Sequence, residues 1–182
     1  IPDGLAVEEP FHIVFLSSAD GEPRASHPRT LIVAGRSSKA AIIETYAAVG
    51  SGVYFTNAAT EVVAGEGAVI DHTKIQEESL EAFHVATLAA RLERGSRFTS
   101  HSVSLGGCIV RNEIDAILDG EEVDCVLDGL YMAGGHQLVD NHTRIEHAKP
   151  HSQSREVYKG ILDGSSRAVF SGSVVVEQDA RQ

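Results

Sequence analysis

The pentapeptide His72-Thr73-Lys74-Ile75-Gln76 returns as His142-Thr143-Arg144-Ile145-Glu146, and the offset in residue number is 142 − 72 = 70. A second pair keeps nearly the same step, because Phe98-Thr99-Ser100-His101-Ser102-Val103 resembles Phe170-Ser171-Gly172-Ser173-Val174-Val175 at an offset of 170 − 98 = 72. An offset that holds over separate segments is typical of a solenoid, in which each unit buries its open face on the next. We therefore expect the two His-Thr-basic-Ile motifs to stack on one side of a solenoid, with Ile75 and Ile145 both buried.

Alternation of apolar and polar residues indicates that the repeating units are built from strands. Val123, Cys125 and Leu127 share one parity, and Asp124 and Asp128 share the other, which is the pattern of a half-buried strand. Breaks that contain glycine follow at intervals of roughly a dozen residues. The segment 111–118 has a composition that a helix would tolerate, but the glycines on either side leave room for only about two turns, so we expect a strand there.

The repeat and the alternation together predict an all-β parallel β-helix spanning residues 1–182 as one domain. The larger offset divides into three coils of about 24 residues, each with two or three short strands, and four coils of about 18 residues fit it as well. A β-sandwich is the alternative fold if the internal resemblance is a coincidence.

Charge and composition narrow the classes of partner. The chain has 15 basic and 26 acidic side chains, so its formal net charge of −11 repels nucleic acid and anionic membrane surfaces. The apolar run 11–16 is far too short to span a bilayer, and no Gly-rich nucleotide loop of the GxxxxGK[ST] type occurs. With only 2 cysteines, a reducing compartment is expected, which for this chain means the cytoplasm. The chain starts at Ile1 and closes on a polar tail, which we interpret as a piece of a longer protein.

Histidines and cysteines are the first candidates for a metal site. His142, His147 and His151 lie within one polar stretch, but His142 and His147 have opposite parity, so in a continuous strand they face opposite sides. Cys108 and Cys125 are separated by 125 − 108 = 17 in residue number, a spacing that stacks them on adjacent coils if coils are short. Burial is the simpler account of Cys125, which shares the apolar parity of its strand. No metal site is assigned to these five residues, and they remain weak candidates.

Acid–base catalysis has candidates in carboxylates such as Asp128, Asp140 and Glu146. A β-helical enzyme that acts on polysaccharides is therefore the alternative function. The strongly acidic chain would repel an acidic polymer, and nothing in the sequence marks two carboxylates at hydrolytic separation.

Several segments, read in order, resemble the SufB/SufD family of iron–sulfur cluster assembly scaffolds. They cover nearly the whole chain from Phe11 onward, and their shared order and spacing is more specific than any one of them. The segments are His27-Pro28-Arg29-Thr30-Leu31-Ile32-Val33, Ile43-Glu44-Thr45-Tyr46, Tyr54-Phe55-Thr56-Asn57, Lys74-Ile75-Gln76, Ser104-Leu105-Gly106-Gly107, Arg111-Asn112-Glu113, Leu118-Asp119-Gly120-Glu121, Asp128-Gly129-Leu130-Tyr131, 142–147, 154–162 and Val169-Phe170-Ser171-Gly172.

The resemblance implies a right-handed parallel β-helix, truncated here at both ends and without the helical regions that flank it in the family. It also implies a non-catalytic scaffold subunit that acts with SufB-like and SufC-like partners, SufC being the ATPase, and that meets iron or an iron–sulfur cluster only transiently in the full complex. The SufD branch is favoured because the stretch Glu44-Thr45-Tyr46-Ala47 carries no cysteine, where the SufB branch is expected to have one. A further strand with a Cys-Ser-His-Gly motif is expected beyond Gln182, so this segment is expected to bind no cofactor itself and to associate with itself through its uncapped C-terminal strand, Ala168–Val176.

Overall fold

The chain forms a β-solenoid of about six coils in a computed structural model that describes residues 1–18 and 22–180. One wall is a six-stranded sheet in the order β1 (Phe11–Ser18), β4 (Lys39–Val49), β6 (Val69–Glu77), β8 (Arg97–Ser104), β10 (Asp124–Ala133) and β12 (Gln153–Leu162). The opposite wall is a seven-stranded sheet of β13 (Arg167–Val176), β11 (Leu138–His147), β9 (Ile109–Leu118), β7 (Phe83–Leu92), β5 (Tyr54–Ala64) and β2 (Arg24–Ser26), with β3 (Arg29–Ala34) also paired to β5. A short 3-10 helix, Gln178–Ala180, follows β13.

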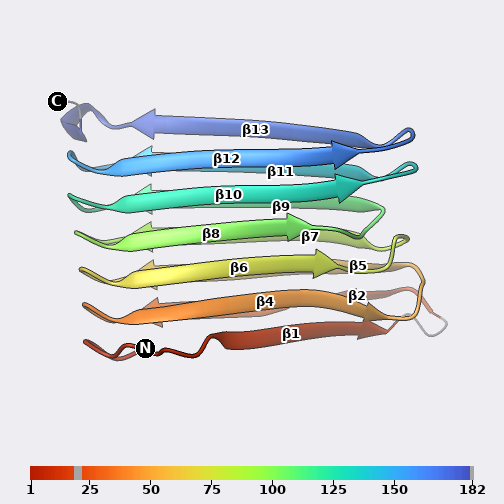
Figure 1. Ribbon diagram of the computed structural model, residues 1–182, viewed down its shortest axis with the longest axis horizontal. Coiled ribbons are helices and arrows are strands. Elements are labelled where there is room, and N and C mark those ends of the chain that lie inside the picture. The colour runs from red at the N-terminus through yellow and green to blue at the C-terminus, as the bar shows by residue number, and fades with distance from the viewer. Residues whose placement is uncertain (19–21, 181–182) are drawn as a thin grey trace.

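From β3 onward, successive strands of the chain alternate between the two walls, so that neighbours within a wall are one coil apart (Figure 1). Every strand ladder is parallel in the part of the chain that the structure describes. This excludes the β-sandwich, whose sheets are antiparallel, and it confirms the predicted parallel β-helix. The segment 111–118 lies within β9 and is a strand, as expected.

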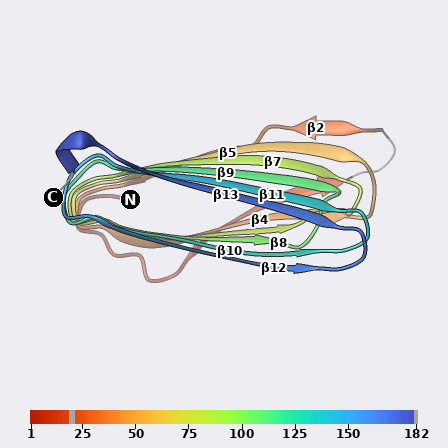
Figure 2. The same cartoon turned by 90° about the horizontal axis from the view of Figure 1, so that it is seen from above.

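The handedness of the coil follows from the direction of the strands. In Figure 1 the strands of the six-stranded wall run from left to right in front, those of the seven-stranded wall run back behind them, and the chain climbs from β1 to β13. The solenoid is therefore right-handed. Figure 2 shows the two walls facing each other and joined by turns at both ends. Over residues 1–18 and 22–180, no helix is long and apolar enough to cross a membrane.

Each coil is longer than the internal repeat led us to expect. Lys39 pairs with Val69 and Val69 with Arg97, so the residue number advances by 69 − 39 = 30 and then by 97 − 69 = 28 from one coil to the next. The offset between the two His-Thr-basic-Ile motifs therefore spans two and a half coils and joins β6 to β11, which lie in opposite walls. The prediction that these motifs stack on one side is wrong.

The same half-coil difference reverses the orientation of the two motifs. Ile145 is buried at 1% exposure, as expected, but Ile75 is only half-buried and faces outward. Its neighbours His72 and Lys74 take the inward positions instead. The prediction of a buried Ile75 is thus wrong, because the interior at this point holds charged groups.

The turns between the walls repeat one backbone conformation. On the side that leads from the seven-stranded to the six-stranded wall, Ser37, Gly67, Gly95 and Glu122 each have positive φ values, between 52° and 68°. The turns bond to each other, since the amides of Ser37, Gly67 and Gly95 donate to the carbonyl oxygens of Glu66, Arg94 and Glu121 at 2.8 to 2.9 Å. The backbone ladder of the strands therefore continues through the turns.

Candidate functional site

The interior between the two walls is apolar toward these turns and polar toward the opposite turns. Large apolar side chains that are fully buried fill the first half, among them Ile70, Leu92, Phe98, Leu118 and Leu127. We call the other half the polar interior. Its inward positions hold the buried residues Glu44, Thr56, Thr60, His72, Lys74, Gln76, Glu78, His84, Ser100, Ser102, Ser104, Asn112 and Asn141.

Glu44, on β4, forms the first centre of the polar interior. Its carboxylate accepts hydrogen bonds from Thr30 at 2.6 Å and Thr60 at 2.8 Å, and it lies 3.0 Å from Nε2 of His72. Burial raises the pKa of Glu44, but the interactions with His72 and Thr30 outweigh this effect and lower the pKa below its ordinary value. Glu44 is thus an ionised carboxylate whose two oxygens both have partners.

Glu78 forms a second centre with His84, near the turn between β6 and β7. Glu78 accepts a hydrogen bond from Thr56 at 2.6 Å and another from Gln76 at 3.2 Å. Nδ1 of His84 lies 2.6 Å from the same carboxylate, although the contact departs from ideal hydrogen-bond geometry. Burial lowers the pKa of His84 to about 4, so the ring is neutral at neutral pH. The His84 ring also meets Tyr46 edge to face, with centroids 4.9 Å apart.

Lys74 connects the two walls across the polar interior. Its ammonium group donates to Oδ1 of Asn112 at 2.6 Å and lies 5.6 Å from the centre of the Tyr46 ring. Asn112 in turn donates to Asn141 at 2.9 Å and to Ser104 at 3.2 Å. Burial lowers the pKa of Lys74 to about 7, while the charges of Glu78 and Glu44 oppose this shift. A cavity of about 20 Å³, room for one water molecule, lies between Lys74, Glu44 and Ser102.

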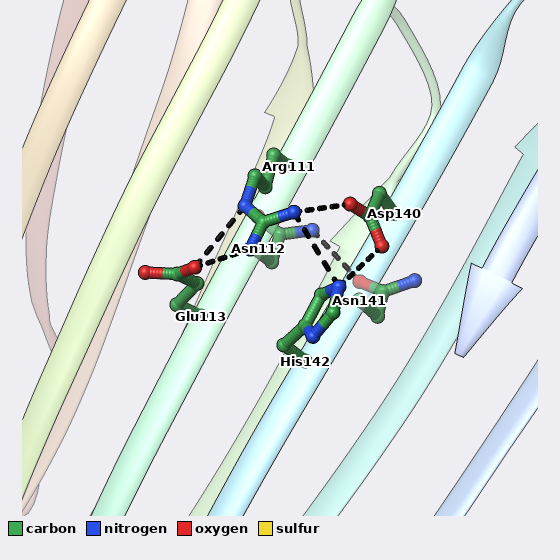
Figure 3. A network of polar contacts seen from close by, with 6 residues as sticks. All are labelled: Arg111, Asn112, Glu113, Asp140, Asn141 and His142. Atoms are coloured by element: carbon green, nitrogen blue, oxygen red, sulfur yellow. Dashed lines mark hydrogen bonds and ion pairs between the residues drawn. The ribbon is translucent and has the colours of Figure 1, made fainter. Parts of the chain in front are cut away.

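A separate ion-pair cluster covers the outer face of β9 and β11 (Figure 3). The guanidinium of Arg111 contacts Glu113 and Asp140, each at 2.5 Å, and Asp140 lies 2.8 Å from Nε2 of His142. The figure also shows the Asn112–Asn141 hydrogen bond on the inner side of the same two strands. Arg111 and His142 are more than a third exposed, so the cluster is a solvated surface network.

The histidines considered as metal ligands do not converge. His142 faces outward toward Asp140, whereas His147 lies 2.9 Å from Ser154 and His151 is exposed in the turn before β12. The opposite parity of His142 and His147 thus gives them different surroundings, as the sequence predicted. Within the ranges 1–18 and 22–180, no group of three or more histidine, cysteine or acidic side chains is arranged to hold a metal ion.

The two cysteines lie apart and do not stack. Cys125 is buried between Phe98 and Ser154 in its wall, and burial raises its pKa to about 12. Cys108 is half-buried in the turn before β9, where its backbone bonds to Ala82 and Leu138. The interval between the two cysteines is much shorter than one coil, so the expectation that they stack on adjacent coils is wrong. The placement of Cys125 on an apolar face is confirmed.

The sequence did not predict the polar interior, because the expected burial of Ile75 places His72, Lys74 and Gln76, which have the opposite parity, on the solvent side of the strand. No local signal marked it, because Glu44 sits in a strand rich in apolar residues that resembles any buried strand. An inward-facing polar side chain can be predicted only when its partners on the opposite wall of the solenoid are known. Those partners, Thr60 on β5 and Asn112 on β9, lie 16 and 38 residues away from Glu44 and Lys74 in sequence.

Fold and interior together define a class, namely two-walled parallel β-solenoids whose core contains hydrogen-bonded ionisable side chains. The chain matches the family model described as "SUF system FeS cluster assembly, SufBD core domain" over residues 15–182. It therefore belongs to the SufBD core domain family.

Curated relatives agree with this assignment. The chain is 31% identical over 189 aligned positions to an iron–sulfur cluster assembly SufBD family protein of Synechocystis sp., an alignment that covers 100% of the chain and 42% of the relative. It is 28% identical to the iron–sulfur cluster assembly protein SufD of Escherichia coli, covering 89% of the chain and 38% of that protein. It is 29% identical to the chloroplastic protein ABCI7 of Arabidopsis thaliana, covering 100% of the chain and 40% of the relative. The chain thus spans less than half the length of these relatives.

Proposed function

We propose that the protein is a SufD-like scaffold subunit of the SUF system, which supports the assembly of iron–sulfur clusters. The observation that carries the proposal is the match to the SufBD core domain over nearly the whole chain, together with a relative that is itself named SufD. The parallel β-solenoid supports it, because a rigid stack of strands with long outer faces suits a protein that acts by holding others. The role is that of a non-catalytic component.

The partners in this proposal are SufB-like and SufC-like subunits, and the compartment is the cytoplasm. Co-expression of the full-length protein with both subunits of the same organism tests the assignment. We expect a stable complex that elutes as one species and supports cluster assembly on an apo-acceptor protein. A full-length protein that binds neither subunit contradicts the proposed function.

Cluster binding is proposed to need groups from outside this segment, so iron or an iron–sulfur cluster is cargo of the full complex and not a resident cofactor here. The histidines and cysteines described above are scattered, which supports this view. We predict that residues 1–182, reconstituted anaerobically with iron and sulfide and then desalted, show no visible absorption band. A stable chromophore that is lost in Cys108→Ser or Cys125→Ser would overturn the prediction.

A further inference from the structure

The outer face of the six-stranded wall carries a hollow across β8, β10 and β12 that the proposed function does not yet use. We call it the outer groove. Its volume is about 360 Å³, and its apolar lining comes from Val103, Leu130 and Val157, one on each strand. Leu130 is 41% exposed although β10 is flanked by a strand on each side, so its exposure does not arise from a sheet edge.

Exposed apolar side chains continue beyond the groove along β10 and β12. Met132 follows Leu130 on the outer side of β10 and is 47% exposed, and its register partner Ile161 on β12 is 58% exposed. Exposed apolar side chains that adjoin one another on a protein surface commonly mark a contact site. The groove and this extension therefore offer one continuous apolar surface.

Charge around the outer groove differs in sign from that of the molecule. Asp128 is the acidic group of the lining, and it is matched by Arg155 at 3.4 Å and by His101 at 3.9 Å. Lys159, the register partner of Leu130, is exposed and has no ion-pair partner among the residues that the structure describes. A chain of net charge −11 thus presents an unmatched cation beside its apolar groove.

We propose that the outer groove docks an amphipathic segment of another subunit, with apolar side chains on Leu130 and Val157 and a carboxylate on Lys159. An apolar face with an acidic flank complements both the groove and its cation. A second copy fits poorly, because the same face of the copy offers Lys159 and Arg155 but no carboxylate other than Asp128, which is already paired. The inference rests on the proposed scaffold function and specifies one surface through which it acts.

The test uses the full-length protein and short, labelled, overlapping peptides that tile the SufB-like and SufC-like subunits and the rest of the protein's own chain, with binding measured by fluorescence anisotropy. We expect at least one peptide that combines apolar and acidic residues to bind. Lys159→Glu and Leu130→Ser should each weaken that binding about tenfold or more, which corresponds to roughly 1.4 kcal/mol. Lys149→Glu, the same charge change in an exposed turn, is the matched control and should leave binding unchanged.

A charge exchange separates direct pairing from a structural effect. A peptide in which the acidic residue is replaced by lysine should lose affinity for the wild type and regain it with Lys159→Glu. The proposal is overturned if no such peptide binds, if binding is the same with Lys159→Glu, or if only peptides from the rest of the protein's own chain bind. Complex formation by the wild type is measured separately, so loss of this docking site is distinguishable from failure of the scaffold function.

Discussion

Burial of the Lys74 ammonium group makes stability depend on pH in the alkaline range. The pKa is lowered from 10.5 to about 7 in the folded protein, so between these values the unfolded chain binds more protons and stability rises with pH. The contribution is fully present above pH 10.5 and is lost as the pH falls through about 7. We predict that the wild type gains about 2 to 3 kcal/mol of unfolding free energy relative to Lys74→Met between pH 7 and 9.5, measured by urea denaturation. A difference that is independent of pH would show that the amine is hydrated in the native state.

His84 produces a second dependence on pH, on the acid side. Its pKa is lowered from 6.5 to about 4, so its contribution is present above pH 6.5 and is lost as the pH falls through about 4. The groups that face it are Glu78 and, through charge, Lys74. We predict that the wild type loses about 1 to 3 kcal/mol between pH 7 and 4.5, and that His84→Gln shows a flatter profile. His136→Gln, at an exposed position in the turn before β11, is the control and should follow the wild type.

At the scale of the elements, one turn between the walls has a strained backbone at a position where two other turns have glycine. Glu122 has φ 60° at the place in its turn where Gly67 and Gly95 stand in theirs. In this conformation a residue with a side chain destabilises the folded state by about 1 kcal/mol relative to glycine. Glycine offsets part of this gain, because it increases the conformational entropy of the unfolded chain. We predict that Glu122→Gly raises the free energy of unfolding by about 0.5 kcal/mol, and that Glu121→Gly next to it lowers it. Thermal and urea unfolding of the two variants measure this, and equal effects would contradict the role of the φ angle.

Strand periodicity was readable from the sequence, but the length of the coil was not. Val123, Cys125 and Leu127 predicted their own burial, since alternation depends only on neighbours two positions apart. The recurrence of the His72 motif at His142 was misleading, because the two motifs lie in strands of opposite walls. The similarity of two segments does not show which wall each belongs to unless the strand register is known. The candidate site depended even more on distant partners. The inward Lys74 bonds to Asn112 on the other wall, a partner 38 residues away that the local sequence does not indicate.

At the scale of the whole molecule, the last coil presents an open edge. β12 and β13 each pair on one side only among the described strands, and Phe170, Val174 and Val176 share the inward face of β13 yet are 42% to 58% exposed. We predict that residues 1–182 expressed alone form a homodimer or larger species through this edge, which added salt favours by screening the net charge over roughly 8 to 10 Å. Light scattering across a salt series should show this, and Val174→Lys should reduce it. A monodisperse monomer at every salt and protein concentration, with no effect of Val174→Lys, would mean that the edge does not pair.

The hydrogen-bonded polar groups of the interior also determine which coils the molecule can lose. In a solenoid with a uniform apolar core, one coil can replace another, and deletion of a whole coil leaves a shorter but sound stack. Here three successive coils, from β4 to β9, are matched to one another, since Glu44 contacts His72 in the next coil, and Lys74 donates to Asn112 in the coil after its own. Removing the coil of β6 and β7 would leave Glu44 without His72, and removing the coil of β8 and β9 would leave Lys74 without Asn112, and a buried polar group that loses its partner costs about 1 to 3 kcal/mol. The coils from β4 to β9 are therefore not interchangeable, and deletion of one of them should destabilise the solenoid more than deletion of the last coil.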